Sequence, residues 1–392
     1  MQLFQFNFSY AEIICFGILF LVFIYQIYYY VRYINGAKRY SKKQQKSDTE
    51  FIKGNPPVSV IICARNEEEN LQQFLPLILS QKYADFEVIV IDDGSEDNTT
   101  YLLDNLKKTH PNLRSTFVPK NTKTLSTKKL GLSLGIKAAA NELLVLTDAD
   151  CRPASEFWLA NIARNFTSET EIVLGYSAYN EEDTFTNRMI TYDTLFTALQ
   201  YLGMALAHKA YMGVGRNLAY RKSTFYENGG FTPTLHLKSG DDDLFVNRAA
   251  TRINTRIEIS PESVTWSEPK HNFRNWLYQK MRHLSVSGNY SSKSKMQIAL
   301  EPLTRGLFYA AFVTSLILSI IFGNLITCGA TFLLFFTRYF TQFFIINHAA
   351  HHFGGMRKYV FSLPVADIFI PLFNLFILTI KRPAKRGKNI FW

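Results

Sequence analysis

Long uncharged apolar runs occur near both ends of this chain, and none of comparable length occurs between them. Residues 13–30 contain no charged side chain, and neither do residues 306–337. At a rise of about 1.5 Å per residue, the first run is long enough to cross a bilayer as one helix. The second is too long for one crossing. Its Gly323-Asn324 pair predicts a turn between two helices, over 307–322 and 325–346.

Basic residues follow the first and the last apolar run. Residues 32–53 hold seven basic and two acidic side chains, and the last twelve residues hold five basic and none acidic. With a net charge of +11, this placement predicts cytoplasmic anchors at an anionic membrane face. It disfavours a signal peptide, in which the positive charges precede the apolar run. Nucleic-acid binding is the competing interpretation of the charge, but no basic stripe or known motif accompanies it.

A third C-terminal run, 361–380, contains Pro364, Asp367 and Pro371. Three full crossings after the central region would place the basic tail on the opposite side from residues 32–46. We therefore expect one of the three segments to be re-entrant or interfacial, and 361–380 is the candidate. Arg338 lies inside the second segment and is costly in lipid, so it should face protein or water.

These runs divide the chain into four predicted parts. They are an N-terminal transmembrane helix (1–34), a basic linker (35–55), a cytoplasmic domain (56–300) and a C-terminal membrane region with a basic tail (301–392). The four cysteines lie far apart without a CxxC pair, which excludes a disulfide framework and a zinc site of the usual spacing.

The central region alternates apolar, β-branched runs with helical patterns. Strands are predicted over 58–64, 86–92, 115–119 and 142–148, with helices between them. This order predicts a doubly wound, mostly parallel α/β sheet of Rossmann-like type. In such sheets ligands bind beyond the carboxyl ends of the strands, where the acidic clusters of this chain occur. No GxGxxG follows the first strand, which argues against a dinucleotide oxidoreductase.

Asp148 and Asp150 follow the buried run LLVLT and are separated by one residue, so on an extended chain they point the same way. Two carboxylates at a strand end suit Mg²⁺ or Mn²⁺, which prefer carboxylates together with substrate phosphates. The alternative is an Asp-rich turn that caps backbone N–H groups. Asp92-Asp93 at the end of another strand favours the ligand-binding interpretation.

Three further features are open to two readings each. Asp92-Asp93-Gly94-Ser95 is either a turn with a helix cap or a nucleotide site. Lys128 or Lys129 is either solvated or neutralises a phosphate. The acids 241–243 are either a solvated helix start or include a general base whose pKa is raised by its neighbours.

In this order the segments resemble family 2 glycosyltransferases with the GT-A fold, over residues 56–283. The resemblance rests on VSVIICARNEE, VIVIDDGSEDNT, the helix start at Lys128, LLVLTDADCRP, GRNLAYRKSTFYENGGF, GDDDL and QKMRH, each of which is weak alone. The flanking helices are similar to those of membrane-bound members of the family.

The resemblance implies a nucleotide-sugar donor, most simply a UDP-sugar, and assigns roles residue by residue. The implied donor-binding residues are Ala64, Asn66, Glu67, Asp92, Asp93, Lys128 and Asp148. The implied metal ligands are Asp150 and Asp148, with Mg²⁺ or Mn²⁺ as cofactor. Asp242 matches the catalytic base, and Asp241 replaces the Glu that often precedes it. Gln279, Arg282 and His283 match the motif beside the diphosphate and the acceptor. His283 stands where that motif has Trp, which favours a single transfer over polymer synthesis.

The implied function is membrane-bound, inverting sugar transfer to a lipid-linked or cell-envelope glycan acceptor. It implies an integral protein of the bacterial inner (cytoplasmic) membrane, with its catalytic domain in the cytoplasm and no nucleic-acid partner. By the same resemblance, 217–220 and 229–231 line the acceptor side, although a core hairpin is the alternative. A catalytically degenerate membrane scaffold and a nucleotidyltransferase are the competing functions.

Overall fold

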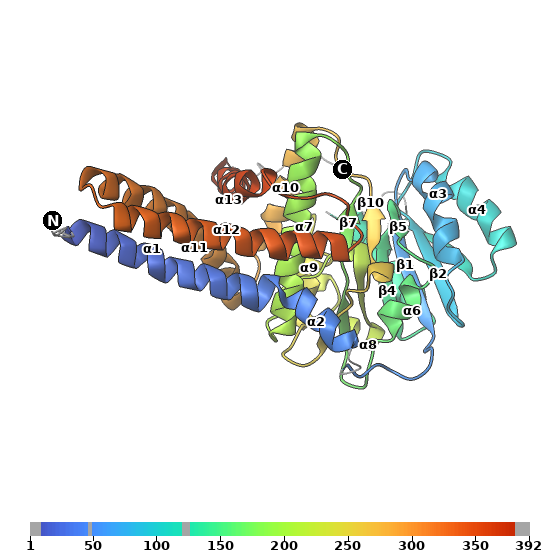
Figure 1. Ribbon diagram of the computed structural model, residues 1–392. Coiled ribbons are helices and arrows are strands. Elements are labelled where there is room, and N and C mark those ends of the chain that lie inside the picture. Colours follow the sequence, from blue (N-terminus) through green and yellow to red (C-terminus); the bar gives the residue numbers. More distant parts are fainter. Residues whose placement is uncertain (1–8, 46–48, 120–125, 381–392) are drawn as a thin grey trace, which may run out of the picture.

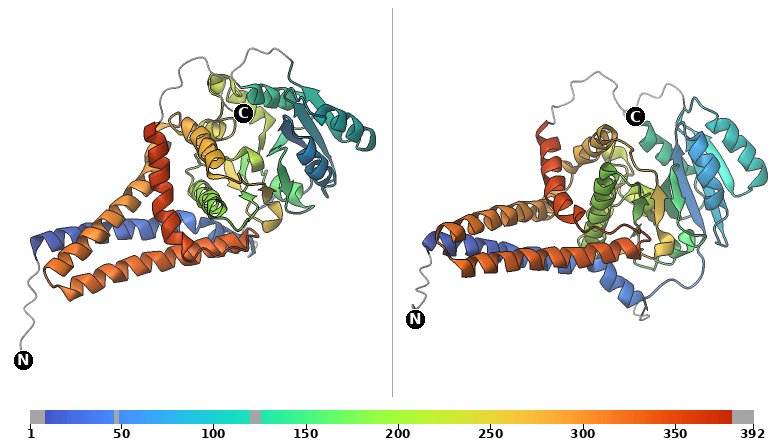
Figure 2. Two further views of the ribbon diagram at one scale, coloured as in Figure 1. Left: turned by 90° about the horizontal axis from the view of Figure 1, so that it is seen from above. Right: turned by 45° about the horizontal axis from the view of Figure 1, so that its top comes forward.

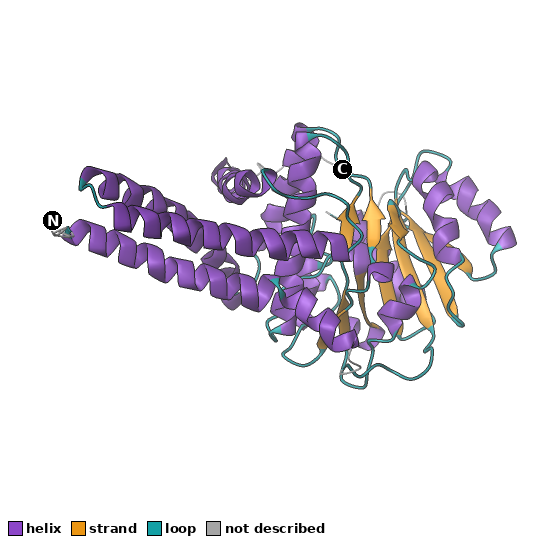
Figure 3. Ribbon diagram, in the orientation of Figure 1, coloured by secondary structure: helices purple, strands orange, loops and turns teal. Residues whose placement is uncertain are grey.

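The computed structural model describes residues 9–45, 49–119 and 126–380. Figure 1 shows an α/β domain from which a long helical arm projects. Figure 3 shows that the strands are confined to the α/β domain, whereas the arm is entirely helical. The apolar runs and the alternating central region of the sequence therefore form different parts of the molecule.

A seven-stranded sheet forms the centre of the domain, in the order β3-β2-β1-β4-β8-β6-β9. Its strands are β1 (Val58–Ala64), β2 (Phe86–Asp92), β3 (Leu113–Phe117), β4 (Leu143–Asp148), β6 (Ile172–Leu174), β8 (Leu218–Arg221) and β9 (Thr255–Ile257). Strands β1 to β4 are parallel and β8 is antiparallel to β4, so the predicted mostly parallel sheet is confirmed. The third strand lies two residues before the predicted one, because Leu113 is buried at its start and Pro119 has no N–H to donate.

Helices cover both faces of this sheet. One face carries α3 (Glu68–Leu79), α4 (Thr99–Thr109) and α6 (Trp158–Ala163), and the other carries α5 (Thr127–Ala138) and α7 (Phe185–Leu206). Successive side chains of a strand point to opposite faces, so Val60 and Ile62 pack toward α3 while Ile61 packs toward α5. Each such burial contributes about 1.5–3 kcal/mol relative to exposure, which explains why the strands are apolar throughout.

A second, three-stranded sheet has the order β5-β10-β7. Its strands are β5 (Cys151–Pro153), β7 (Ser177–Tyr179) and β10 (Thr265–Ser267). Only Ala149 and Asp150 separate the end of β4 from the start of β5. Asp148 and Asp150 therefore lie at the corner between the two sheets.

Three long helices form the arm, namely α1 (Tyr10–Tyr29), α11 (Ser292–Ile321) and α12 (Leu325–His352). They lie side by side in Figures 1 and 2. Gly323, with φ of +63°, makes the turn between α11 and α12, which confirms the predicted hairpin. A π-helical turn (Tyr30–Ile34) joins α1 to α2 (Gly36–Gln45) at the domain end of the arm.

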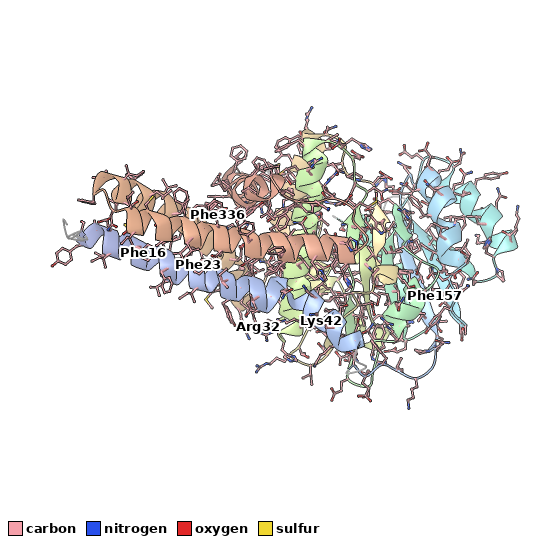
Figure 4. All side chains as sticks on the ribbon, viewed as in Figure 1. Phe16, Phe23, Arg32, Lys42, Phe157 and Phe336 are labelled. Carbon is pink, nitrogen blue, oxygen red and sulfur yellow. The ribbon has the colours of Figure 1, made fainter. Side chains whose placement is uncertain are left out.

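Four helical segments are long and apolar enough to cross a membrane by length and composition: Tyr10–Gln44, Ser292–Ile321, Leu325–His352 and Ser362–Ile380. Figure 4 shows Phe16, Phe23 and Phe336 along the arm, and Arg32 and Lys42 where the arm meets the domain. Apolar and basic side chains are thus separated along the arm as the sequence predicts.

Helix α13 (Ser362–Ile380) does not run with the arm. Figure 2 shows it crossing the axes of the other three helices beside the domain. It packs against α10 (Phe273–Ser287), where the rings of Trp276 and Phe373 lie 4.9 Å apart between centroids. Since α13 is also long and apolar enough to cross a membrane, the expectation that 361–380 is not a third full crossing stays a prediction. The basic tail, 381–392, lies outside the described residues.

Arg338 lies inside the arm and is only 2% exposed. Its guanidinium donates to the carboxylate of Asp367 on α13 at 2.8 Å and to the side-chain oxygen of Gln26 on α1. The prediction that this arginine faces protein is confirmed.

Candidate active site

The carboxyl ends of three neighbouring strands gather the acidic residues that the sequence singles out. In the parallel register, Ala64 of β1 lies beside Asp92 of β2, and Cys63 of β1 lies beside Asp148 of β4. The main-chain oxygen of Ala64 accepts from the N–H of Asp93 at 2.8 Å. Residues more than eighty positions apart in the sequence therefore share one edge of the sheet.

The loops that follow β1 and β2 are bound to each other. Asn66 has a φ of +54°, and its side-chain oxygen accepts from the N–H of Glu96 at 2.7 Å. The N–H of Glu67 donates to the hydroxyl of Thr99 at 3.1 Å. Burial raises the pKa of the Glu67 carboxyl, and the nearby charges of Asp150 and Asp148 raise it further. The two loops form one platform that faces these carboxylates.

Asp92 and Asp93 are both buried, at 7% and 5% exposure. Asp92 accepts from the N–H of Ser95 at 2.8 Å and from the hydroxyl of Thr100 at 2.5 Å, so it closes its own turn. Asp93 accepts from the hydroxyl of Thr127 at 2.6 Å. Residues 92–95 therefore form a turn closed by their own side chains, as one of the two interpretations of this segment expects. Each carboxylate oxygen still has a second lone pair for a ligand.

Lys128 joins two acidic segments that are distant in the sequence. Its ammonium lies 2.9 Å from Asp148 Oδ1 and 3.5 Å from Asp241 Oδ2. Burial raises the pKa of Asp148, but the Lys128 cation beside it outweighs burial and holds that pKa below its ordinary value. Lys128 thus stabilises the ionised form of Asp148.

For Asp150, the charges of Arg216 and Lys128 oppose the effect of burial on the pKa but do not outweigh it. Its carboxylate accepts a bond from the Cys151 thiol at 3.4 Å, and burial together with the charge of Asp148 raises its pKa. A cation beside Asp150 would offset both effects. Among the described residues, no three His, Cys, Asp or Glu side chains group as a metal site. Two carboxylates alone still fit Mg²⁺ or Mn²⁺, since these ions take their remaining ligands from substrate phosphate and water.

The three consecutive acids diverge at the start of α9 (Asp243–Ala249). Asp242 caps this helix and accepts from the N–H groups of Gly215 at 2.7 Å and Asp243 at 2.8 Å. Asp243 is 8% exposed and accepts from the hydroxyl of Tyr290 at 2.7 Å. Burial and the neighbouring Asp242 raise the pKa of Asp243 to about 7. The solvated-helix-start interpretation is therefore wrong for Asp243, which is a core residue.

Asp148 and two of the three consecutive acids line one small cavity. Its walls include Lys128, Asp148, Gly215, Asp241 and Asp242. Burial and the charge of Asp241 raise the pKa of Asp242 above its ordinary value, although the Gly215 N–H and Lys128 act in the opposite direction. The cavity thus brings together a carboxylate held ionised by a lysine and one with increased basicity.

Helix α10 carries the QKMRH segment to the same region. Gln279 donates to the hydroxyl of Tyr179 at 2.8 Å, and Arg282 and His283 are solvent-exposed. The charge of Arg282 is one of the cations that lower the pKa of Asp148. His283 is thus an exposed side chain next to the cation of Arg282.

Sequence reasoning missed Arg216. Its guanidinium lies 4.2 Å over the ring of Tyr179 and donates to the Ser267 hydroxyl at 2.6 Å. It also counteracts the burial that raises the pKa of Asp150. The residue lies in the GRN segment that precedes β8, but no pattern in the sequence distinguishes it from the other arginines.

For the segments 217–220 and 229–231, burial favours the core alternative over an acceptor-lining role. Asn217 and the residues of β8 from Leu218 to Tyr220 are 0% exposed because β8 pairs with both β4 and β6. Phe231 is also buried, against Phe225. Residues 217–220 and Phe231 therefore belong to the core, as the alternative interpretation expects, whereas Gly229 is exposed. Lys129, unlike Lys128, is fully buried, and its ammonium donates to main-chain oxygens.

Comparison with known proteins finds one family model, described as glycosyl transferase family 2, that matches residues 59–229. The probable glycosyltransferase YdaM of Bacillus subtilis (strain 168) is 24% identical over 238 residues, which cover 59% of this chain and 56% of that protein. Glycosyltransferase AglE of Haloferax volcanii is 28% identical over 199 residues, which cover 50% of this chain and 61% of that protein. The chain thus spans little more than half the length of these curated relatives.

Among solved structures, the chain is similar to the mannosyltransferase PcManGT from Pyrobaculum calidifontis in complex with GDP-Man and Mn²⁺. The TM-score is 0.55 at 20% sequence identity, and the match covers 88% of this chain and 98% of that one. At this identity the likeness concerns the fold. The fold is the GT-A fold, as the sequence motifs imply.

Proposed function

We propose that this protein is a membrane-bound, inverting glycosyltransferase, because the model of glycosyl transferase family 2 matches residues 59–229. It transfers a single sugar from a nucleotide-sugar donor, a UDP-sugar, to a lipid-linked or cell-envelope acceptor. The observation that carries this proposal is the cavity that Asp148, Lys128, Asp241 and Asp242 share. A donor diphosphate held at Asp148 would have its sugar beside Asp242.

The donor side uses the platform at the ends of β1, β2 and β4. Asp92 and Asp93 accept hydrogen bonds from the nucleoside, with Ala64, Asn66 and Glu67 forming the adjoining wall. Asp148 and Asp150 would hold Mg²⁺ or Mn²⁺, and such an ion would supply positive charge that stabilises the diphosphate leaving group. Arg282 lies on α10 across from these carboxylates and adds a fixed positive charge toward the same phosphates.

The acceptor side uses Asp242. Its carboxylate takes the proton of the acceptor hydroxyl while that oxygen attacks the anomeric carbon from the face opposite the leaving diphosphate. Two N–H groups fix the orientation of the Asp242 carboxylate, so its remaining lone pairs are directed before the acceptor binds. Gln279 and His283 border the acceptor path, and the absence of a Trp at position 283 suits one transfer per acceptor.

The apolar arm supports a location of this chemistry at a membrane face. Helices α1, α11 and α12 cross the bilayer, and α13 lies in the interface, with exposed apolar side chains such as Ile368, Leu372 and Leu375. Three crossings leave the domain and the end of α12 on the same side. The basic residues of α2 support a cytoplasmic location for that side. An amphipathic or lipid-linked acceptor reaches the cavity from this surface.

The proposal is tested with a panel of labelled UDP- and GDP-sugars incubated with membranes that contain the protein. We expect one donor to label an organic-phase product with release of a nucleoside diphosphate, and each product to gain one sugar. Release of pyrophosphate would instead identify a nucleotidyltransferase. Donor binding without turnover, over a broad set of acceptors, would support a scaffold.

Asp150→Asn is expected to weaken Mn²⁺ binding at least about tenfold, because even changes to residues around metal ligands cost about 10- to 100-fold. Binding is followed by Mn²⁺ paramagnetic resonance with UDP present, which needs no turnover. Glu169→Gln, an exposed carboxylate elsewhere in the domain, is the matched control. Unchanged Mn²⁺ affinity in Asp150→Asn would remove this residue from the metal site.

A further inference from the structure

Lys129 is a buried cation that the proposed mechanism does not use. It follows Lys128 in the first turn of α5 and is 0% exposed. Its ammonium donates to three main-chain oxygens, those of Thr234 at 2.7 Å, Leu237 at 3.1 Å and Ser239 at 2.8 Å. A lysine ammonium has three N–H donors, so these carbonyls use all of them.

The three carbonyls belong to one loop, residues 232–239, which is otherwise largely open to solvent. Thr232, Pro233, Leu235, His236 and Lys238 are exposed. A loop with so few buried side chains has little apolar packing to hold it. The ammonium of Lys129 supplies that anchorage, since bonds from a charged donor are stronger than those between neutral groups.

This loop leads directly into the acceptor-side carboxylates. Ser239 precedes Asp241 by two residues, and Gly240 between them has a φ of +91°. A Cβ at Gly240 would lie 2.6 Å from Leu244 and 2.7 Å from Val286 of α10, so the backbone passes tightly between α9 and α10. The position of the Ser239 carbonyl therefore limits where Asp241 and Asp242 can lie.

The first turn of α5 thus holds this segment from two directions. Lys128 reaches the side chain of Asp241 and also Asp148 on the donor side. Lys129 reaches the main chain just before Asp241. One turn of helix connects the donor-side strand end to the acceptor-side carboxylates.

We propose that Lys129 is a positioning residue that holds the 232–239 loop and, through it, places Asp242 for the acceptor without contacting the donor. The inference rests on the proposed function in assigning Asp242 to the acceptor. It predicts that loss of Lys129 separates two properties of the enzyme. Transfer to the acceptor falls, whereas donor binding and slow donor hydrolysis by water persist.

The test compares Lys129→Met with Lys137→Met, an exposed lysine of the same helix, in full-length protein. Trypsin cleavage after Lys238 should become about tenfold faster in Lys129→Met, since buried carbonyls that lose a charged donor no longer hold the loop closed. Transfer should fall by about tenfold or more. The KM for the donor should stay within about twofold, because Lys129 lies outside the donor platform. Lys137→Met should match the wild type in every assay.

Lys129→Gln keeps two N–H donors, so its cleavage and transfer rates should lie between those of the wild type and Lys129→Met. It replaces Lys129→Met in the comparison if Lys129→Met does not fold. Wild-type cleavage and transfer in a folded variant would overturn the proposal, as would equal losses of transfer and donor hydrolysis. Failure of both variants to fold would also overturn it, because Lys129 would then be a general core residue. If the wild type neither transfers nor hydrolyses any donor, the proposed function fails, while the cleavage result still decides on the loop.

Discussion

Sugar transfer by Asp242→Asn is expected to be about 100- to 10,000-fold slower than by the wild type, the range typical of removing a general base. An amide cannot accept the proton of the acceptor hydroxyl. It keeps the size of the carboxylate, although one of the two N–H groups that now face Asp242 loses its acceptor. Transfer is measured with the donor identified in the panel. Donor binding, measured by thermal shift, should remain.

The pH dependence of sugar transfer is a second test of the assignment of Asp242 as the general base. Burial and Asp241 raise the pKa of Asp242, while Lys128 and the N–H groups of Gly215 and Asp243 limit the rise. Since the base must be ionised, wild-type kcat/KM should fall as the pH is lowered through this raised pKa. The residual activity of Asp242→Asn should lack that decrease.

Asp241→Asn is the matched comparison, because Asp241 lines the same cavity but pairs with Lys128. A greater loss of transfer in Asp241→Asn than in Asp242→Asn would assign the base to Asp241. Full transfer by Asp242→Asn would refute the assignment.

Asp367→Leu is expected to destabilise the protein by about 3–5 kcal/mol, because it leaves a buried arginine without its acidic partner. Asp367 is 0% exposed and accepts from Arg338 at 2.8 Å, from Tyr309 at 2.7 Å and from Gln342 at 3.1 Å. Arg305 lies 3.2 Å away but also pairs with Glu301 on its own helix. In Asp367→Leu, Arg338 therefore loses its carboxylate partner, whereas Arg305 keeps Glu301. The effect is measured by thermal unfolding in detergent.

The double variant Arg338→Met/Asp367→Leu should recover most of this loss, because it removes both charges and leaves apolar side chains of similar volume. Thr337→Val, an exposed position on the same helix, is the control. If the double variant were as unstable as the single one, packing of α13 rather than charge would account for the effect.

Helix α13 packs on α10, which carries Gln279 and Arg282. A loss of sugar transfer that parallels unfolding in these variants would therefore connect the arm to the candidate site.

Much of the fold follows from local patterns. The runs VSVIICA, FEVIVID and LLVLTD are apolar throughout because both sheet faces are covered, and each forms a strand close to its predicted bounds. The acids at their carboxyl ends are near one another because parallel strands bring those ends to one edge. Uncharged runs of membrane length likewise predict the helices of the arm.

The roles of adjacent residues could not be predicted in this way. Lys128 and Lys129 have the same side chain, but successive helical positions point about 100° apart, so one reaches Asp148 and the other the 232–239 loop. The three consecutive acids 241–243 also point in different directions. Asp243 is buried and accepts a hydrogen bond from Tyr290. Asn217 to Tyr220 resembled an acceptor wall, but pairing on both sides places it in the core.

The sequence by itself therefore determined the order of strands and helices, the strand-end carboxylates and the lengths of the apolar helices, because these depend on periodicity and on residues within one element. Only the tertiary structure decided which lysine faces the carboxylates, that Arg216 lies beside them, and that α13 crosses the arm with Asp367 against Arg338. These depend on contacts between residues far apart in the sequence. Their direction is set by how whole elements pack, which no local pattern encodes.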